Sequence, residues 1–544
     1  MAERAHNKGS NSLFRCILSV LCLQILNSAS SPAANRSAEL SQKTEIIGGT
    51  VSTAWATLDL VDLVKSSRSN CSIDSRKLVR CAGPLRIEGL TDTSVQGHGV
   101  QVQFLNAEAG KGGVELVSAT NVNFSDVEIG WLGGGARDPL VPGVERIQSF
   151  GSVAACANGE TGGVLSLDLP VKGNAALETV SVWDDALGWP WFRTAPEESE
   201  VIFPKNNRVA FADGRSNCID RLAQLIGRRV LARHIVFTNH AFHCVGCRNV
   251  TVEKVKVTSA PGMAFVFEGG AYKITLRANV VGPKCAPFCS KPEPSTTADA
   301  AHFAGVEGNI VIENNDFGWQ GDDGLNITGL LIPALVETQT QESWLRVDDQ
   351  WKGRLGLLRV GQKILIFDQG LSSKGEAEVL DIARSTGRMK VSRLPSDTGN
   401  IIISGVDTIP RNVVIRNNRF HDNRARGILI GASDTLIEKN VIERVTMEAV
   451  LVPADTGPWY EGPGSTHVRI THNRISDVNR YPAVKDYPSA ISAGVRLSAG
   501  YAGDVGTPIR DIVVESNSIT NIYSNGAIPV FFGRGVEGGQ AKAN

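Results

Sequence analysis

The chain has 544 residues, 56 of them glycine, and its formal net charge at pH 7 is only −1. Charged residues make up 20% of the sequence and aromatic residues 6%. The near-zero net charge excludes a global electrostatic attraction to nucleic acid or to an anionic membrane surface. A chain of this length often folds as several domains, but one long repetitive domain with insertions explains its patterns better.

The first 30 residues have the pattern of an export signal. Positive charges at Arg4 and Lys8 come first, an apolar run covers residues 17–26, and small residues occupy 28–30. The run is too short to span a bilayer, which favours a cleaved signal peptide over residues 1–30. A buried N-terminal strand is the alternative. No other segment has the apolar length of a membrane span, so we expect a secreted or periplasmic protein with no membrane insertion.

One strand-like unit recurs along the chain. Each copy alternates apolar and polar residues, and Asn, one further residue and another apolar residue follow. The clearest copies cover 274–281, 310–317, 414–420, 436–442, 468–475 and 513–519. The shortest separation, from Asn418 to Asn440, is 22 residues and sets a period in the low twenties. This period predicts a parallel β-helix, since the leucine framework of leucine-rich repeats is missing.

The repeated Asn is expected at the sharp bend between two strands, because Asn tolerates left-handed backbone geometry. Its side-chain amides can also hydrogen-bond to one another from coil to coil.

The repeat is interrupted twice, which predicts an all-β chain with inserted subdomains. We expect β-helix coils over 45–137, 236–330 and 410–535. Residues 138–235 lose the repeat and are rich in Trp, Pro and Gly, which predicts an inserted β-rich subdomain. Residues 331–409 contain short strand patterns that predict an inserted β-barrel. A barrel at that point would wall one side of a cleft.

Eight cysteines lie outside the predicted signal, and an even number in an exported chain permits disulfides. Cys285 and Cys289 could close a small clip in a Pro-rich loop. Cys244 and Cys247, with two histidines just before them, resemble a zinc site. However, Cys247 begins a repeat strand, where small buried residues are expected. We therefore favour buried or disulfide-bonded cysteines, with the pairing open, over zinc.

One carboxylate and an adjacent pair of carboxylates are separated by about one repeat. Asp299 precedes Asp322 by 23 residues, and Asp323 follows directly. If each repeat is one coil, these acids stack on neighbouring coils and face the same way. Gly321 and Gly324 are expected to give the chain freedom to bend so that both later acids face a groove. Among like charges one carboxyl can hold a proton while another stays ionised, as glycoside hydrolysis requires.

Two simpler interpretations compete with catalysis at this cluster. Isolated Asp residues in turns are usually decoration, and three neighbouring acids could instead bind Ca²⁺, as in a polysaccharide lyase. The whole set, with His302, Glu313 and Asn326 nearby, favours catalysis. No metal and no cofactor are predicted.

The residues around the acids resemble glycoside hydrolase family 110, whose members are α-1,3-galactosidases built on a right-handed β-helix. The resemblance runs from roughly 235 to 520 and includes a barrel at the corresponding place. The motif blocks that carry it lie at 299–303, 308–317, 322–329, 423–430 and 447–464. The sequence departs from the family at Thr328, where a His is frequent, and in the loop 462–464. Both departures leave the exact glycan open.

The resemblance implies an exo-acting enzyme that inverts the anomeric carbon without a metal. It makes Asp299 the general acid, while Asp322 and Asp323 position and deprotonate the attacking water. Simple stacking of coils gives a separation of about 5 Å, closer to the spacing in retaining enzymes than in inverting ones. Inversion is therefore an expectation from the resemblance alone.

Seven further side chains are predicted to bind the oligosaccharide or glycan substrate. Arginines offer paired donors to sugar hydroxyls, glutamates accept from hydroxyls, and a tryptophan offers an apolar face to a pyranose ring. These residues are His302, Asn326, Arg424, Arg426, Glu448, Trp459 and Glu461. The alternatives are salt bridges between coils for the arginines and loop packing for the tryptophan.

Other carbohydrate-active β-helices are the competing functions. A polygalacturonase-like hydrolase shares the Asp-Asp pair, but its Asn-Thr-Asp-Gly and Arg-Ile-Lys elements are missing. A Ca²⁺-dependent lyase would need an anionic substrate. A non-catalytic, glycan-binding β-helix would bind sugars and release none. The oligomeric state stays open, with a homodimer as one option.

Overall fold

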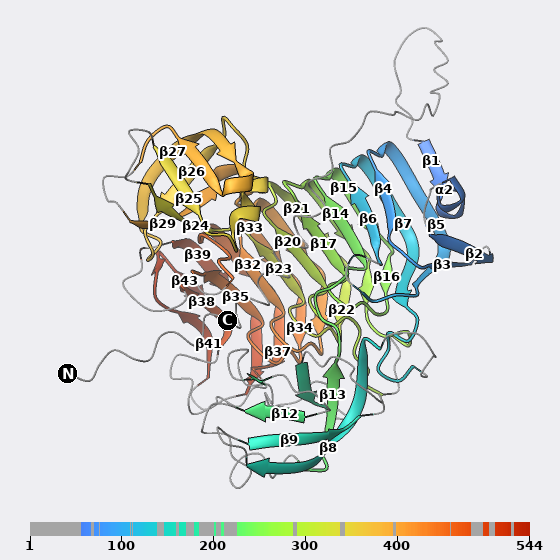
Figure 1. Ribbon diagram of the computed structural model, residues 1–544. Helices are drawn as coiled ribbons and strands as arrows, with labels where there is room; N and C mark the ends of the chain where they lie inside the picture. Colours follow the sequence, from blue (N-terminus) through green and yellow to red (C-terminus); the bar gives the residue numbers. More distant parts are fainter. Residues whose placement is uncertain are drawn as a thin grey trace.

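The computed structural model describes residues 56–138, 146–158, 163–169, 179–183, 201–202, 208–211, 226–286, 291–337, 343–394, 399–479 and 493–544, with a few shorter gaps inside these ranges. The predicted export signal lies outside them. Within this part of the chain, no helix has the length and apolar character needed to cross a membrane. Nearly all regular structure is strand, and successive coils stack side by side (Figure 1). The all-β, parallel β-helix prediction is therefore confirmed.

One face of the stack is a parallel sheet that we call the ten-stranded sheet; it carries the candidate site. Each coil contributes one short strand to it. Its strands are β4 (Leu85–Glu88), β6 (Val114–Val117), β14 (Phe242–Val245), β17 (Phe265–Glu268), β20 (Ala301–Ala304), β23 (Leu325–Thr328), β32 (Ile428–Gly431), β35 (Val450–Ala454), β38 (Ala493–Ala499) and β41 (Ile528–Phe532).

The remaining faces form a second sheet, which has 21 strands in the described part of the chain. Its strands are β1 (Ala56–Asp59), β2 (Cys71–Ser75), β3 (Leu78–Cys81), β5 (Thr91–Phe104), β7 (Thr120–Trp131), β15 (Arg248–Glu253), β16 (Lys256–Val257), β18 (Tyr272–Arg277), β19 (Val280–Val281), β21 (Gly308–Glu313), β22 (Asp316–Gly318), β30 (Arg411–Arg416), β31 (Arg419–His421), β33 (Ser433–Glu438), β34 (Val441–Glu443), β36 (Ser465–Thr471), β37 (Arg474–Val478), β39 (Ile509–Glu515), β40 (Ser518–Ile522), β42 (Val536–Glu537) and β43 (Gln540–Lys542).

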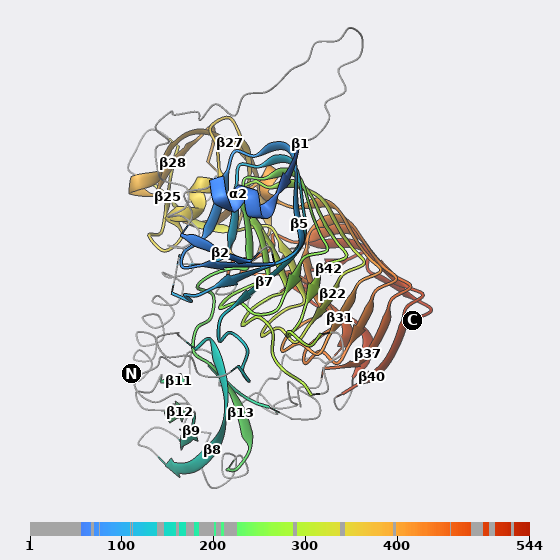
Figure 2. The same cartoon turned by 90° about the vertical axis from the view of Figure 1, so that its right-hand side faces the viewer.

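The core lies inside the coils, where every second residue of a strand points inward. In the view turned by 90°, successive coils lie nearly one behind another (Figure 2). Like side chains therefore stack between neighbouring coils. The rings of Phe267 and Phe303 stack with centroids 4.7 Å apart, and those of Phe317 and Phe420 meet edge to face at 5.8 Å. The inward row is thus apolar, and the outward row is free to carry chemistry.

The repeated Asn residues form the hydrogen-bonded ladder that the sequence predicted. In each step one amide Nδ2 donates to the Oδ1 of the next Asn, at 2.9 or 3.0 Å. The ladder, which we call the asparagine ladder, consists of Asn279, Asn315, Asn418, Asn440, Asn473, Asn517 and Asn544.

One detail of that prediction is wrong. The left-handed backbone belongs to the residue before each ladder Asn, such as Ala278, Asn417 and Lys439, rather than to the ladder Asn itself. Asn fits this position because its side-chain amide forms hydrogen bonds with buried backbone groups and with the Asn residues of neighbouring coils.

Two insertions interrupt the coils. The first contains a six-stranded sheet of β8 (Gln148–Asn158), β9 (Gly163–Asp168), β10 (Thr179–Val182), β11 (Val201–Ile202), β12 (Arg208–Phe211) and β13 (Arg229–Arg233). The second is a closed barrel of β24 (Ile332–Val336), β25 (Trp344–Val347), β26 (Lys363–Phe367), β27 (Ser373–Ala383), β28 (Arg388–Val391) and β29 (Asn400–Gly405), with its own apolar core. The predicted barrel is therefore present.

The barrel also holds a loop against the ten-stranded sheet. Its 3-10 helix η3 (Lys352–Leu357) carries Arg354. The guanidinium of Arg354 donates to the carbonyls of Leu331, Tyr460 and Trp459 at 2.7, 2.9 and 2.8 Å. The loop that contains Trp459 is thus fixed through its backbone beside the outward face of the coils.

A short helix, α2 (Leu60–Ser66), stands at the N-terminal end of the stack and was not predicted from the sequence. Leu60 and Val64 on this helix are buried in the main core. The helix therefore covers apolar side chains of the first coil, which no preceding coil of the described chain covers.

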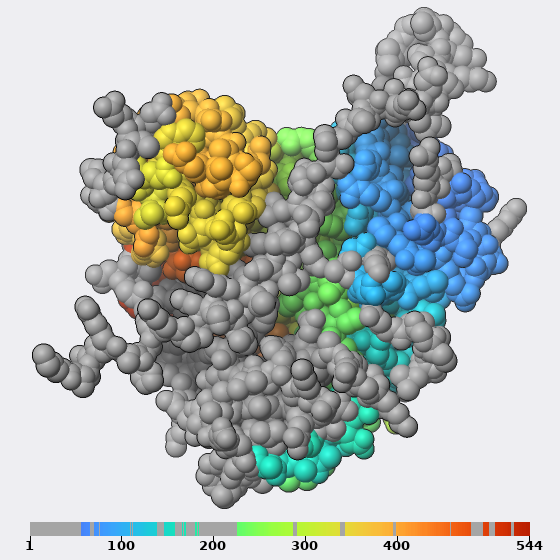
Figure 3. Space-filling view, viewed as in Figure 1, coloured from blue at the N-terminus to red at the C-terminus, as the bar shows by residue number. Residues whose placement is uncertain are grey.

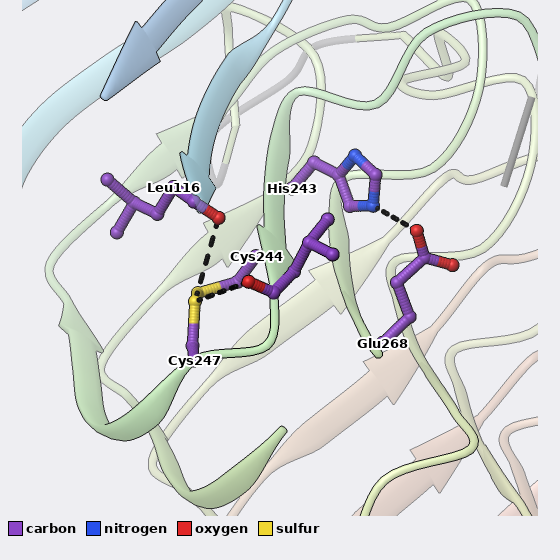
Figure 4. Close-up of a disulfide and its surroundings, with 6 residues drawn as sticks. Leu116, His243, Cys244, Cys247 and Glu268 are labelled. Atoms are coloured by element: carbon purple, nitrogen blue, oxygen red, sulfur yellow. Dashed lines mark hydrogen bonds and ion pairs between the residues drawn. A yellow bond between two sulfur atoms is a disulfide. The ribbon is translucent and has the colours of Figure 1, made fainter. Parts of the chain in front are cut away.

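The cysteines in the described part of the chain are disulfide-bonded. Cys71 pairs with Cys81, and Cys244 pairs with Cys247 (Figure 4). A disulfide cannot supply two thiolates to zinc, so the disulfide interpretation of Cys244 and Cys247 is confirmed over the metal. Cys285 is also disulfide-bonded, while Cys289 lies outside the described residues.

Candidate active site

The three acids lie at the edge of the ten-stranded sheet, just before two neighbouring strands. Ala301 of β20 pairs with Leu325 of β23, so one coil advances the chain by 24 residues. This register aligns Asp299 with Asp323, and the 23-residue register that aligned Asp299 with Asp322 is wrong by one residue. One oxygen of each carboxylate nevertheless lies within 4.8 Å of the others. The predicted gathering of the three acids is present.

A backbone N–H and a histidine side chain fix the Asp299 carboxyl. The Asp323 N–H donates to Asp299 Oδ1 at 3.1 Å, which ties the two coils together at the site. Nδ1 of His302 lies 2.8 Å from Asp299 Oδ2. His302 is on β20, three residues after Asp299, and points outward from the sheet beside Asn326 of β23. Asp299 is therefore held on both of its oxygens.

Two arginines from the following coil hold the acid pair. The backbone N–H of Arg426 donates to Asp323 Oδ1 at 2.8 Å, and its Nη1 lies 3.3 Å from Oδ2. Arg424 Nη2 lies 3.3 Å from Asp322 Oδ2, and its Nε donates to the Gly321 carbonyl. The cross-coil salt bridges expected as an alternative for these arginines are thus formed. Their role toward a substrate stays a prediction.

The glycines beside the acid pair have a different function from the one expected. Neither has a left-handed backbone, so freedom to bend does not explain them. A Cβ on Gly321 would collide with the Thr297 carbonyl, and one on Gly324 with the Gly427 carbonyl. The two glycines allow the acid loop to approach the coils on either side closely.

Burial and mutual repulsion shift the acids toward neutrality. Burial raises the pKa of Asp299 to about 6, with the Asp322 charge adding to the effect while His302 opposes it. Burial likewise raises the pKa of Asp323 to about 7, with Arg426 opposing it. Burial alone would lower the pKa of His302, but the hydrogen bond and charge of Asp299 raise it to about 9. Near neutral pH, the buried pair of carboxyls can therefore hold a proton.

Asp322 is more exposed to solvent than Asp299 and Asp323. The Asp322 side chain is 24% exposed, against 6% for Asp299 and 5% for Asp323. In the space-filling view, green atoms of coils that precede the acids in the sequence reach the surface between the barrel and the N-terminal coils (Figure 3). The site thus offers a buried proton-holding pair beside a more exposed carboxylate.

The remaining predicted binding residues surround the acids from later coils and from the barrel-held loop. Asn326 Nδ2 donates to Glu461 Oε2 at 3.4 Å. Glu448 lies 3.9 Å from Arg426 and accepts from Arg496 at 3.1 Å. The structure therefore brings six of the seven predicted binding residues into one connected cluster with the acids. Among the described contacts, none joins the Trp459 ring to that cluster.

Several buried polar atoms in this cluster have no partner within the protein. They are Asn326 Oδ1, Thr328 Oγ1, Arg426 Nε and Glu448 Oε2. Buried polar groups are nearly always satisfied in folded proteins, because an unsatisfied one is costly. These four unsatisfied atoms therefore mark a part of the protein that is not optimised for stability alone.

Sequence reasoning missed two residues that support the site. Asn423 is fully buried, and its Nδ2 donates to the carbonyls of Asp322 and Arg426 at 2.9 and 2.8 Å. Arg496, on β38, binds Glu448. The motif around Asn423 could have indicated the first residue. Nothing near Arg496 distinguishes it from an ordinary outward position of a strand.

Comparisons with known proteins agree with the β-helix fold. Residues 395–536 match the family described as the right-handed β-helix region. The chain is 25% identical to alpha-1,3-galactosidase A of Bacteroides fragilis over 262 residues, which are 46% of this chain and 42% of the relative. It is also 25% identical to alpha-1,3-galactosidase B of Phocaeicola vulgatus over 311 residues, 53% of this chain and 51% of the relative.

The chain is similar to α-1,3-galactosidases. The resemblance expected from the motifs is confirmed, and the chain spans about half the length of the curated relatives it matches. Among solved structures, the catalytic domain of a GH87 α-1,3-glucanase in complex with tetrasaccharides is 11% identical, with a TM-score of 0.37 over 92% of this chain and 60% of that chain.

Proposed function

We propose that the protein is a glycoside hydrolase that releases terminal α-1,3-linked galactose from an oligosaccharide or glycan. The observation that carries the proposal is the acid cluster, in which two buried carboxyls and one half-buried carboxyl approach within 4.8 Å. The similarity to α-1,3-galactosidases supports the choice of sugar and linkage.

In the proposed reaction, Asp299 donates its proton to the glycosidic oxygen as the bond to the anomeric carbon breaks. Asp322 and Asp323 orient a water and accept its proton as the water oxygen bonds to that carbon. His302 holds Asp299 in place through its 2.8 Å contact. The unpartnered atoms of Asn326 and Glu448 accept hydrogen bonds from hydroxyls of the galactose.

Exo-action and inversion are parts of this proposal that rest on the resemblance. The carboxylate oxygens lie within 4.8 Å, which is nearer to the separation of about 5–5.5 Å in retaining enzymes than to the longer one in inverting enzymes. NMR of the first product decides between them: β-galactose from an α-linked substrate means inversion, whereas α-galactose means retention.

The deciding experiment for the function is incubation with α-1,3-linked galactosyl disaccharides and detection of free galactose. Asp299→Asn and Asp323→Asn serve as inactive controls. Release by the parent protein and loss in both variants supports the proposal. No release by the parent, or undiminished release by both variants, rejects it.

A cation-dependent lyase is the second candidate, because three carboxylate oxygens within 4.8 Å could also hold a divalent cation. Such an enzyme would lose its activity on chelation and would form an unsaturated sugar from an anionic polysaccharide. Galactose release that survives chelation removes this candidate. Binding of glycans with no released sugar would instead favour a non-catalytic role.

We also propose that residues 1–30 export the protein to the periplasm or beyond the cell. The order of positive, apolar and small residues supports this. Fractionation of cells that express the full chain and a chain without residues 1–30 tests it. Equal retention of both forms in the cytoplasm would contradict export.

A further inference from the structure

A ladder of charged residues runs along the edge of the ten-stranded sheet. The strand register aligns Asp299, Asp323, Arg426 and Glu448, each two residues before its strand, on four successive coils. We call these four residues the charged ladder. The next coil places Ala493 at the equivalent position, so the ladder of charges stops there.

Arg496 reaches back to the last member of this ladder. It lies three residues after Ala493 on β38, and its Nη1 donates to Glu448 Oε1 at 3.1 Å. The Glu448 side chain is only 7% exposed, so this contact is made largely out of water. A buried carboxylate gains much from such a partner, because its own hydration is lost.

Arg426 is shared between two acids and is bound tightly to neither through its side chain. Its Nη1 lies 3.5 and 3.3 Å from the two oxygens of Asp323. Its Nε lies 3.9 Å from Glu448 and has no hydrogen-bond partner. Charge-assisted hydrogen bonds are normally about 2.7–2.9 Å long, so a small movement of Glu448 would give it a full bond to Arg426.

We propose that Arg496 is a positioning residue that holds Glu448 away from Arg426, so that the Arg426 guanidinium stays on Asp323. This inference rests on the proposed function in taking Asp323 to be a reacting acid. Without Arg496, Glu448 has lost its closest cation and Arg426 is its nearest replacement. The guanidinium then turns from Asp323 toward Glu448.

The protonation of Asp323 would report this movement. The charged groups that face it are Arg426, Asp322, Asp299 and His302. Burial and the two neighbouring acids raise its pKa, and Arg426 lowers it. Loss of Arg496 weakens the lowering influence, so the pKa of Asp323 rises further. Removal of Glu448 frees Arg426 for Asp323 and moves the pKa the opposite way.

Stability measurements can detect this shift without any activity. The folded-state pKa of Asp323 is about 7, above the value of an unfolded Asp. The folded state therefore binds this proton more tightly, and stability falls as pH rises from about 4 to 7. A higher folded-state pKa extends that fall to higher pH. The melting temperature of Arg496→Met, relative to the parent, should then decrease progressively between pH 6 and 8.

The control for this comparison is the same pair of proteins with Asp323→Asn. We expect the pH-dependent part of the difference to disappear there, because the group that titrates is gone. A difference that does not depend on pH, or one that persists with Asp323→Asn, would overturn the proposal. The second outcome would assign the effect to Glu448 alone.

Activity provides the second readout. In the pH profile of kcat/KM for galactose release, the limb governed by Asp323 should move up by about one unit in Arg496→Met, and down in Glu448→Gln. Arg496→Lys should recover most of the parent profile, because it keeps a cation near Glu448. A profile that keeps its shape while the rate falls equally at every pH would contradict a positioning role.

Arg469→Met is the matched control, because Arg469 pairs with Glu515 on the other sheet and is 60% exposed. It should leave both readouts unchanged. If the parent releases no galactose, the proposed function fails, and the melting comparison still decides whether Arg496 acts on Asp323.

Discussion

Two ladders run along the same coils and show two uses of one geometry. In the asparagine ladder every position holds the same neutral amide, and each internal Asn donates to one neighbour and accepts from the other. In the charged ladder two carboxyls, an arginine and a glutamate occupy equivalent positions on four coils. Stacking satisfies amides, but it forces like charges together and leaves polar atoms without partners.

The comparison distinguishes a ladder that stabilises the fold from a ladder that lowers its stability at the candidate site. An amide ladder lowers the free energy of every coil it joins. Burial raises the pKa of both aligned acids, and neighbouring carboxylates add to the effect, so each is stabilised as a neutral group. Substitutions in the asparagine ladder should therefore act mainly on the free energy of unfolding. Substitutions in the charged ladder should act mainly on activity.

The largest effect is expected from Asp299→Asn. The variant keeps the shape of the side chain but cannot donate the carboxyl proton, so kcat should fall by about 10²–10⁴. The Asn side chain keeps an oxygen acceptor for the Asp323 N–H, but the charge that pairs with His302 is lost, so the free energy of unfolding should also fall. Galactose release is the measurement, with Asp349→Asn as the control, since Asp349 is 95% exposed on the barrel. An equal loss in the control would point to a general effect of the substitution.

Asn418→Ala should break the asparagine ladder at a buried internal position. Asn418 Nδ2 donates to the Ile312 carbonyl, and its Oδ1 accepts from both the N–H and Nδ2 of Asn315. Because these partners stay buried and unpaired, the free energy of unfolding should fall by about 3 kcal/mol. Denaturant unfolding measures it, with Asn400→Ala as an exposed control. Loss of activity in the folded protein would show that the ladders are not separable.

The sequence predicts much of this contrast, and the parts that it does not predict have physical reasons. The period-two strands and the repeated Asn predict the coils, because both ladders require identical stacking at each turn. The register at the acids is wrong by one residue, because the coil there advances 24 residues and the spacing of two Asp residues does not reveal which of the pair aligns with Asp299.

The partners of the acids are harder to predict than the acids. Arg426 aligns with Asp323 through the pairing of β23 with β32, but the inserted barrel places the two residues 103 positions apart in the sequence. To predict the contact of Arg496 with Glu448, one must know which residue of β38 aligns with Glu448. A single sequence does not define that strand register. The helix α2 was missed because its seven residues are too few for a helical period to stand out.

The pH dependence of stability should separate the charged ladder from its neutral counterpart. The folded parent holds a proton on Asp323 up to about pH 7, whereas the Asn side chain of Asp323→Asn does not titrate. The parent should lose stability relative to this variant as pH rises from about 5 to 8, by on the order of 1–3 kcal/mol. Denaturant unfolding at both pH values measures the change. A difference that is constant with pH would mean that Asp323 is ionised throughout.

The smallest effect is expected at the end of the asparagine ladder, from Asn544→Ala. Asn544 accepts from Asn517 Nδ2 at 2.9 Å and is exposed, so water can replace it when it is removed. The free energy of unfolding should fall by less than about 1 kcal/mol, well below the loss at Asn418. Denaturant unfolding of the two variants side by side tests this order. Equal losses would mean that the ladder acts as one cooperative unit, in which the burial of a single rung does not decide its contribution.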